Sequence, residues 1–273
     1  MKIPNIRNLQ EGLLIGRPIW DVELTTRCNK SCYMCPRGGL VRKKQDMDIA
    51  RFERFVDWLE RPVDIVFAGF GEPTIHPDYL AAIAYAAAKG HGTSLMTNGK
   101  NLSSESIAAM FAAGLQKLQV SILYPQEQHR LPQLREWSAD LRPDHFQLNL
   151  ICEAPETIDD EDLKTLQTDG TNFMLKRVHN KAGLVSDVPN PIQGSCGTFF
   201  LVTYLNTDGD FHICSNDING LHRLGNFEQV TYQELIDLKR AYFGNRTIAT
   251  LCLSCTDEYR FKHFQKSGDV VDY

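Results

Sequence analysis

Three cysteines stand close together near the N-terminus, at Cys28, Cys32 and Cys35. Thiolates separated by three and two residues can share one metal ion or one iron–sulfur cluster. Three ligands do not complete a tetrahedral zinc site, whereas a four-iron cluster held by three cysteines keeps one iron open for a small molecule. A zinc site with a distant fourth ligand and a ferredoxin-like site are the alternatives, although a ferredoxin would place two residues in each gap.

Four more cysteines gather toward the C-terminus, at Cys196, Cys214, Cys252 and Cys255. The first two flank an expected hairpin, and the last two form a CxxC pair after an expected helix. Such thiols can converge on one metal, and their spacing suits a structural zinc ribbon as well as an iron–sulfur cluster. Cys152 stands apart on the apolar face of an expected strand, which predicts a buried structural thiol.

The composition is that of a globular protein in a reducing compartment. Of the 273 residues, 42% are apolar and 23% charged, which excludes a disordered chain. The net charge of −5 favours neither a nucleic-acid nor a membrane partner, and no apolar stretch is long enough to span a bilayer. The N-terminus carries no secretory signal, so we expect a cytoplasmic location, where eight cysteines favour metal or redox chemistry over disulfides.

Strand and helix patterns alternate about six times before residue 180. Strands are expected at 20–26, 63–68, 93–97, 118–122, 145–151 and 173–179; helices are expected at 49–59, 78–89, 103–113 and from a capping box of Thr157 and Asp160 to Gly170. Residues 126–140 are polar and fit neither pattern. The alternation predicts an α/β fold with a parallel sheet and outer helices, either open or closed into a barrel.

Chemistry in such folds lies at the carboxyl ends of the strands. The cysteine triplet, Gly69–Pro73 and Thr97–Gly99 all follow expected strands, which indicates one shared site. On the strand at 145–151, His145, Gln147 and Asn149 alternate with apolar residues. This alternation predicts a polar barrel interior that could hold a polar substrate.

The pattern changes after about residue 185. Prolines at 189 and 191 predict a linker, and the segments 198–205 and 210–213 predict a hairpin. A helix is expected from a cap at Thr231 and Glu234 to about residue 242. We therefore expect two domains, 1–185 and 186–273, the second a small α+β unit with a hairpin and a helix.

The segment from Cys28 to Cys35 resembles the signature of the radical S-adenosylmethionine (SAM) superfamily. It has the form C-x3-C-x2-C with the hydrophobic Met34 before the third cysteine, and it follows the first expected strand. The resemblance implies a partial (β/α)6 TIM-like barrel, a [4Fe–4S] cluster on the three cysteines and SAM on its open iron. In that family an external one-electron reductant, such as flavodoxin or ferredoxin, drives cleavage of SAM to a radical that abstracts hydrogen from the substrate.

A second motif strengthens the resemblance. The stretch from Phe70 to Pro73 is similar to the GGEP motif that contacts the SAM amino group, where glycine permits close approach and the carboxylate attracts the ammonium. Two further positions, at the third and fourth strand ends, match residues that line the methionyl or ribose group. The implied SAM contacts are Met34, Phe70, Gly71, Glu72, Pro73, Thr97, Asn98 and Ser121.

The C-terminal spacing, C-x17-C and then C-x2-C after a helix, resembles the twitch domain, a shortened SPASM domain. That resemblance implies a second, auxiliary [4Fe–4S] cluster on Cys196, Cys214, Cys252 and Cys255. The stretch Asn180–Gly183 is similar to an Asn-Arg-Gly-Gly stretch in radical SAM dehydrogenases of the butirosin type, which oxidise the aminocyclitol 2-deoxy-scyllo-inosamine. Lys181 stands where that stretch carries an arginine that is a proposed base, which makes Lys181 the candidate catalytic residue.

The leading hypothesis is oxidation of a secondary alcohol on a small polar substrate, aminocyclitol or sugar-like, to a ketone. A base would take the hydroxyl proton, and the auxiliary cluster would accept the remaining electron. The alternatives are a radical epimerase, which needs a hydrogen donor such as Cys152, and an enzyme that forms or rearranges carbon–carbon bonds, including bonds of a peptide. An iron–sulfur electron carrier is the non-enzymatic alternative, but it needs neither an open iron nor a SAM-binding glutamate.

Overall fold

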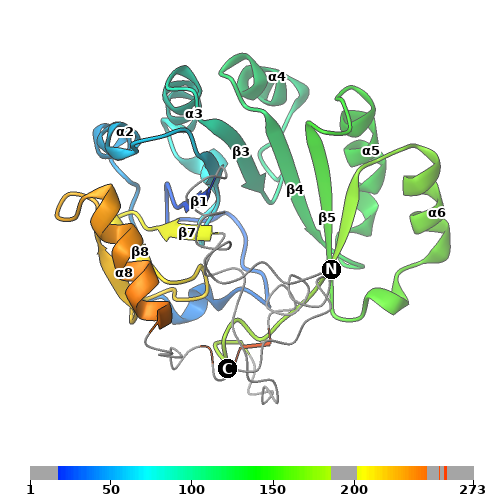
Figure 1. Ribbon diagram of the computed structural model, residues 1–273. Helices are drawn as coiled ribbons and strands as arrows, with labels where there is room; N and C mark the ends of the chain where they lie inside the picture. Colours follow the sequence, from blue (N-terminus) through cyan, green and yellow to red (C-terminus); the bar gives the residue numbers. More distant parts are fainter. Residues whose placement is uncertain (1–17, 186–201, 245–251, 253–254, 257–273) are drawn as a thin grey trace, which may run out of the picture.

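The computed structural model describes residues 18–185, 202–244, 252 and 255–256. Its strands form one sheet in the order β6-β5-β4-β3-β2-β1-β7-β8-β9. Neighbouring strands from β6 to β1 are parallel, and so is the β1–β7 pair. The β7–β8 and β8–β9 pairs are antiparallel. The sheet curves into a partial barrel with helices α2 to α6 along its outer side (Figure 1). The predicted α/β fold, a partial barrel with a parallel sheet and outer helices, is confirmed.

The elements have the following bounds. The strands are β1 Ile19–Val22, β2 Asp64–Phe67, β3 Gly92–Thr97, β4 Lys117–Leu123, β5 Phe146–Cys152, β6 Phe173–Arg177, β7 Val202–Leu205, β8 Asp210–His212 and β9 Arg223–Asn226. The α-helices are α2 Ile49–Trp58, α3 Tyr79–Ala88, α4 Ser104–Ala112, α5 Leu131–Ala139, α6 Asp160–Thr168 and α8 Tyr232–Gly244. No helix in these described stretches is long and apolar enough to cross a membrane.

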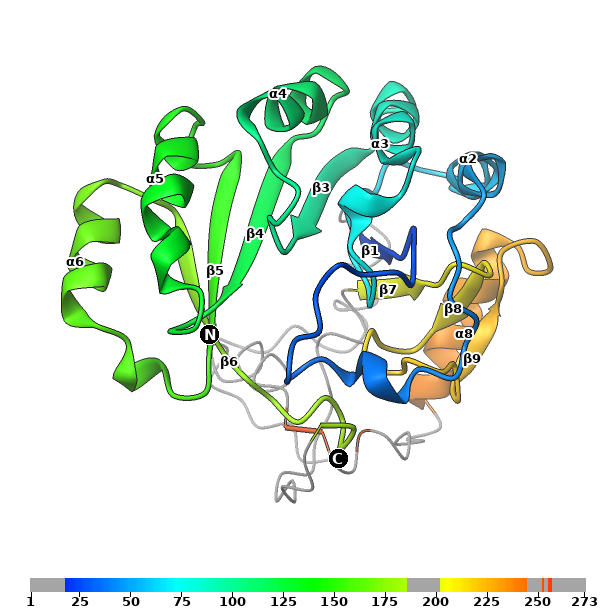
Figure 2. The same ribbon diagram turned by 180° about the vertical axis from the view of Figure 1, so that it is seen from behind.

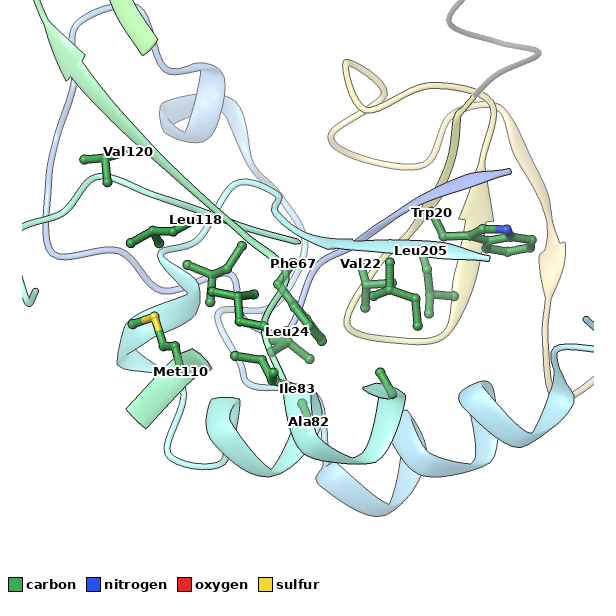
Figure 3. Close-up of a cluster of buried hydrophobic side chains, with 14 of the residues drawn as sticks. Trp20, Val22, Leu24, Phe67, Ala82, Ile83, Met110, Leu118, Val120 and Leu205 are labelled. Carbon is green, nitrogen blue, oxygen red and sulfur yellow. The ribbon is translucent and has the colours of Figure 1, made fainter. Parts of the chain in front are cut away.

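The core fills the layer between the sheet and the outer helices (Figure 3). From the sheet come fully buried side chains such as Val22 and Phe67, and from the helices Ile83 of α3 and Met110 of α4. Because successive strand residues point to opposite faces, this outer packing directs the alternate residues of each strand into the barrel lumen. The packing thus fixes which side chains can meet a substrate.

Three local expectations differ from the structure. The Thr157–Asp160 capping box is wrong: Asp159 caps α6 by accepting from the amides of Glu161 and Asp162, and the Thr157 hydroxyl bonds the Ala154 carbonyl instead. The unassigned stretch 126–140 contains α5, whose buried face is Leu131, Leu134, Trp137 and Ser138. Strand β9 was not expected at all, since it is short and carries a glycine.

The C-terminal hairpin continues the barrel sheet. Strand β7 pairs in parallel with β1, with Asp21 opposite Tyr204, and β8 and β9 follow outward with α8 beside them (Figure 2). An aromatic cluster holds this unit, since the Phe211 ring lies 5.6 Å from Trp20 and 5.2 Å from Trp58. The predicted cap of α8 is confirmed, because the Glu234 amide donates to the Thr231 hydroxyl and the Thr231 amide to the Glu234 carboxylate. The predicted domain boundary at 185 adjoins residues outside the described part of the chain.

Candidate functional site

The cysteine loop is closed at its base directly after β1. The Thr26 amide donates to the Gln45 carbonyl at 3.0 Å, and the Thr25 hydroxyl donates to the Asp46 carboxylate at 2.6 Å. Arg27 forms an ion pair with the same Asp46 carboxylate. The loop therefore leaves and re-enters the barrel at one point, and its cysteines stay at the carboxyl end of β1.

Cys28, Cys32 and Cys35 are half-buried on this loop, with Met34 half-buried between the last two. Burial raises the pKa of the Cys32 thiol, Lys30 lowers it, and the nearby Cys35 and Cys28 raise it further. Within the described ranges, no three metal-ligating side chains converge on one point. Three thiols on one loop, within electrostatic reach of one another, are nevertheless a donor set that suits an iron–sulfur cluster with three protein ligands.

The glycines after β2 allow two backbones to meet. A Cβ on Gly71 would lie 2.7 Å from the Arg27 carbonyl oxygen and even closer to that of Thr25. The Glu72 amide donates to the same Arg27 carbonyl at 2.7 Å. Gly71 is therefore required for contact with the cysteine loop, whereas the sequence motif suggested contact with a ligand.

The Glu72 carboxylate is buried and joins the ends of β2 and β3. Its Oε1 accepts from the Thr97 hydroxyl at 2.7 Å and from the Thr74 hydroxyl at 2.8 Å and amide at 3.1 Å. Its Oε2 accepts from the Asn98 amide at 2.8 Å. Pro73 is buried and begins a short 3-10 helix that presents the Thr74 donors. Within the chain, Glu72 thus acts first as an organiser of these two strand ends.

Asn98 connects this assembly to the cysteines. Its side-chain amide donates to Asn29 Oδ1 at 2.8 Å and lies 3.8 Å from the Cys28 sulfur. Ser121, on β4, is half-buried and accepts from Asn149 of β5 at 3.3 Å. The predicted residues Glu72, Thr97 and Asn98 are therefore assembled beside Cys28, whereas Ser121 belongs to a hydrogen-bonded group on β4 and β5.

Sequence reasoning missed a buried ion pair at the end of β1. Glu23 is inaccessible and accepts from Arg42 at 2.8 Å, from the Tyr204 hydroxyl at 2.7 Å and from the Phe70 amide at 3.2 Å. The half-buried Phe70 ring faces Tyr204 at 6.1 Å. The polar alternation of Asp21, Glu23 and Thr25, on β1 and directly after it, was the available signal. The partners were not visible because Arg42 and Tyr204 are far away in sequence.

A second missed group encloses the cysteine loop from the β4 side. Glu127 accepts from Lys30 at 2.5 Å, from Arg130 at 3.1 Å and from the Leu123 amide at 2.9 Å. Burial raises the pKa of Glu127, but the Leu123 amide and Lys30 outweigh burial and hold it below its usual value. Arg130 also donates to the Asn98 carbonyl at 2.9 Å, so this network links the β3, β4 and cysteine loops.

The C-terminal cysteines are described in part. Cys214 is half-buried after β8, Cys252 is half-buried, Cys255 is buried, and Cys196 lies outside the described residues. The turn after Cys214 docks on the cysteine loop, since Asn219 accepts from the Val41 amide at 2.9 Å and donates to the Gly39 carbonyl at 2.9 Å. The segment that carries Cys214, one of the four predicted ligands, therefore contacts the barrel end. The segment that carries Cys255 does so as well, through Thr256 and Asn180.

The turn that contains Lys181 is tied to the CxxC pair. The Asn180 amide donates to the Thr256 hydroxyl at 3.0 Å, and the Thr256 amide donates back to Asn180 Oδ1 at 2.9 Å. Lys181 is half-buried with a φ of 49°, and its amide donates to His179 Nδ1 at 3.2 Å. This turn therefore connects the end of β6 with the residue after Cys255.

The polar face of β5 is partly as expected. Gln147 donates to Asn149 at 2.8 Å, and Phe146, Leu148 and Leu150 pack in the core on the opposite face. His145 does not join the polar face, because it precedes the strand and its ring stacks on Phe111 of α4 at 5.5 Å. Cys152 is buried in the hydrophobic core, as expected from its position on the apolar face.

Residues 22–140 match the family model of the radical SAM superfamily, which covers less than half of the chain. The matched segment contains the cysteine loop, the Glu72 assembly and the strands that carry them. The barrel, this loop and the match make the chain similar to radical SAM enzymes. Enzymes of this class bind a [4Fe–4S] cluster and SAM, and they need a reductant and a substrate.

Curated relatives match over about a third of the chain. The tungsten-containing aldehyde ferredoxin oxidoreductase cofactor-modifying protein of Pyrococcus furiosus is 31% identical over 97 residues, which are 34% of this chain and 27% of the relative. Mycofactocin maturase MftC of Mycobacterium ulcerans is 33% identical over 101 residues, 37% of this chain and 27% of the relative. The alignments thus span just over a quarter of each relative, and they carry no substrate over to this chain.

Solved structures match over most of the chain. BtrN in complex with AdoMet and 2-DOIA aligns with a TM-score of 0.62 and 16% identity, over 88% of this chain and 93% of BtrN. SuiB of Streptococcus suis bound to the precursor peptide SuiA aligns with a TM-score of 0.61 and 13% identity, over 93% of this chain and 75% of SuiB. At these identities the likeness shows a shared fold.

Proposed function

We propose that this chain is a radical SAM dehydrogenase that oxidises a secondary alcohol of a small, aminocyclitol-like or sugar-like substrate to a ketone. The observation that carries the proposal is the tie between the barrel end and the C-terminal cysteines, through Asn180 and Thr256 on one side and Gly39, Val41 and Asn219 on the other. It supports an electron acceptor near the substrate, which net oxidation requires.

Cys28, Cys32 and Cys35 would hold the first [4Fe–4S] cluster. When bound, this cluster and SAM supply the radical that removes a hydrogen atom from the substrate. The chain's own contribution is to organise the surroundings: Glu72 fixes the Thr97–Asn98 corner, and Asn98 approaches the Cys28 sulfur. The remaining proposed SAM contacts, Met34, Phe70, Gly71, Pro73 and Ser121, lie on the cysteine loop and at the ends of β2 and β4.

Cys196, Cys214, Cys252 and Cys255 would hold the auxiliary [4Fe–4S] cluster of a twitch-type domain. The thiol donors suit iron–sulfur ligation, and two of the loops that carry them contact described parts of the barrel end. In this role the cysteines need to be deprotonated and directed at one centre. Stoichiometric zinc bound by the same four thiols would contradict the electron-acceptor role.

Lys181 is the proposed base for the hydroxyl proton. The turn that carries it is held on both sides, by the Asn180–Thr256 pair and by the Gly183 amide, which donates to the Asn180 carbonyl at 3.1 Å. A rigid turn at the end of β6 suits a residue that must meet a substrate in the barrel. Lys181→Met should keep both clusters and SAM binding while most product formation is lost.

The deciding experiment measures the redox outcome with candidate aminocyclitols under anaerobic conditions. A dehydrogenase removes two electrons and two protons in total, so the product should weigh two hydrogens less than the substrate. An epimerase would return a hydrogen, leaving the mass unchanged in light water and adding one deuterium in heavy water. Deuterium incorporation that Cys152→Ala stops would replace this proposal by the epimerase. A product with new carbon–carbon bonds, on a small molecule or a peptide, would replace this proposal by a bond-forming enzyme.

A further inference from the structure

The inner wall of the barrel carries a hydrogen-bonded polar group on β4 and β5. Lys117 donates to Gln147 at 2.6 Å, Gln147 donates to Asn149 at 2.8 Å, and Asn149 donates to Ser121 at 3.3 Å. The alternate residues of β5 lie in the hydrophobic core, so these four side chains face the lumen. The lumen is therefore built for a polar molecule.

Asp21 reaches the same lumen from β1. Its neighbours Trp20 and Val22 are buried in the core on the outer face, so its carboxylate points inward. In the sheet it lies between Val66 of β2 and Tyr204 of β7. The side chain keeps some accessible surface, and within the described residues its carboxylate has no hydrogen bond and no ion pair.

Among the described residues, the cationic group that acts on Asp21 does not offset its burial. Burial raises its pKa to about 7, and Lys176 of β6 lowers it. Tyr204 faces it from β7, and the Tyr204 hydroxyl donates to Glu23. Because β6 is an edge strand and four strands separate it from β1 in the curved sheet, the influence of Lys176 acts across the lumen.

The neighbouring carboxylates at this end of the barrel already have donors. Glu23 accepts from Arg42, Tyr204 and Phe70, and Glu72 accepts from Thr74, Thr97 and Asn98. An enclosed carboxylate without a donor gains most from a ligand that brings a positive charge and N–H groups.

We propose that Asp21 binds an ammonium group of the substrate, so that the lumen selects amine-bearing polyols over their all-hydroxyl counterparts. This inference rests on the proposed function and names the group that sets its substrate class. The amides of Gln147 and Asn149 and the Ser121 hydroxyl supply partners for the hydroxyl groups. Asp21 in this role is a specificity-determining residue.

The test compares two probes that differ in one group, scyllo-inosamine and scyllo-inositol, by calorimetry on the anaerobic, cluster-loaded protein with SAM. We expect the amine to bind at least about tenfold more tightly at pH 8, because one charge-assisted contact is worth that factor. Asp21→Asn should reduce the preference to about twofold or less. Asp140→Asn, a change of the same kind at an exposed helix end, should leave it intact.

The pH dependence gives a second readout. The wild-type preference should fall as the pH is lowered from 8 to 5.5, since protonated Asp21 no longer attracts an ammonium group, and Asp21→Asn should show no such fall. Equal binding of both probes by the wild type, or a tenfold preference retained by Asp21→Asn, overturns the role of Asp21 alone. If neither cyclitol binds, the proposed substrate class is overturned as well.

Discussion

Glu72 is the residue whose hydrogen bonds join the ends of three strands. It follows β2, its carboxylate accepts from Thr97 and Asn98 after β3, and its amide donates to Arg27 after β1. The carboxylate of a glutamate can accept hydrogen bonds from all of these donors. The side chain of a glutamine in the same position could not, because its NH2 end is itself a donor. The charge of Glu72 therefore matters for the geometry of the loops as well as for any ligand.

We accordingly expect Glu72→Gln to weaken SAM binding by about tenfold or more, since each charge-assisted hydrogen bond is worth about 1.5–3 kcal/mol. Iron content should not change, because the cysteines are not altered. Equilibrium binding of SAM to the anaerobic protein, with iron analysis on the same sample, measures both. Glu136→Gln, on the exposed side of α5, is the control. Unchanged SAM affinity would remove Glu72 from the SAM site.

Asp21 makes a prediction about stability that needs no substrate. Its pKa in the folded protein is about 7, above its ordinary value of 3.8. Well below pH 4 the carboxyl is protonated in both the folded and the unfolded protein, and it does not change the free energy of unfolding. Between pH 4 and 7 the carboxyl is ionised in the unfolded protein but still protonated in the folded one, so the free energy of unfolding falls as the pH rises. Asp21→Asn should therefore stabilise the protein by about 2–4 kcal/mol at pH 8 and by little at pH 4.

Thermal unfolding of wild type and variant between pH 4 and 8.5 measures this difference. The gap in melting temperature should widen as the pH rises from 4 to about 7 and stay constant above that. The same change at exposed Asp140 should give no gap. A constant offset at all pH values would show that Asp21 is ionised in the folded protein.

At the scale of elements, the contact between α2 and the C-terminal strands joins two parts of the chain. Phe211 of β8 packs between Trp20 of β1 and Trp58 of α2, and Phe55 lies within 6.5 Å of the same ring. These aromatic side chains bury large areas and prefer tilted and edge contacts of the kind found here. They hold β8 to the first strand and helix of the barrel.

Phe211→Ala should cost about 3–5 kcal/mol, the usual price of truncating a buried phenylalanine. Chemical unfolding measures the loss, and Phe211→Leu should recover part of it because it fills most of the cavity. We also expect the alanine variant to lose iron from the C-terminal site first, since β8 leads to Cys214. If the free energy of unfolding fell by less than about 1 kcal/mol, contacts other than those of Phe211 would hold β8 to the barrel.

The iron content tests the whole molecule. Anaerobically reconstituted protein should contain about eight irons, as two four-iron clusters. Replacing Cys28, Cys32 and Cys35 with alanine should leave about half of the iron and abolish SAM cleavage. Zinc in equal molar amount, bound by the C-terminal cysteines after iron-replete expression, would contradict the auxiliary cluster.

The charge distribution predicts where the reductant binds. The chain has a net charge of −5, yet residues 24–45 contain six lysines and arginines and no acidic residue. Lys43 and Lys44 are exposed beside Val41, which is 82% exposed. A double change of Lys43 and Lys44 to Glu should slow reduction by an acidic flavodoxin at least about tenfold at low salt, and less at high salt. Reduction by dithionite, monitored optically, is the control and should be unaffected.

The sequence by itself determined the chemistry-bearing cysteines, most of the alternating strands and helices, and their place at the strand ends. These features depend on residue type and short-range periodicity, which a single chain displays directly. Helix α5 escaped because its polar residues obscure the buried face, and the cap of α6 was misplaced by two residues because Asp159 competes with Thr157 for the same role.

Only the tertiary structure decided which groups meet. The Glu23–Arg42–Tyr204 group, the Lys30–Glu127–Arg130 network and the Asn180–Thr256 tie each join residues from separate segments, and β7 continues the barrel sheet beside β1. The same holds for Gly71, whose need for glycine comes from the opposing backbone of Thr25 and Arg27. Such contacts follow from how the strands are ordered in space, and strand order is set by packing over the whole chain, which local sequence does not encode.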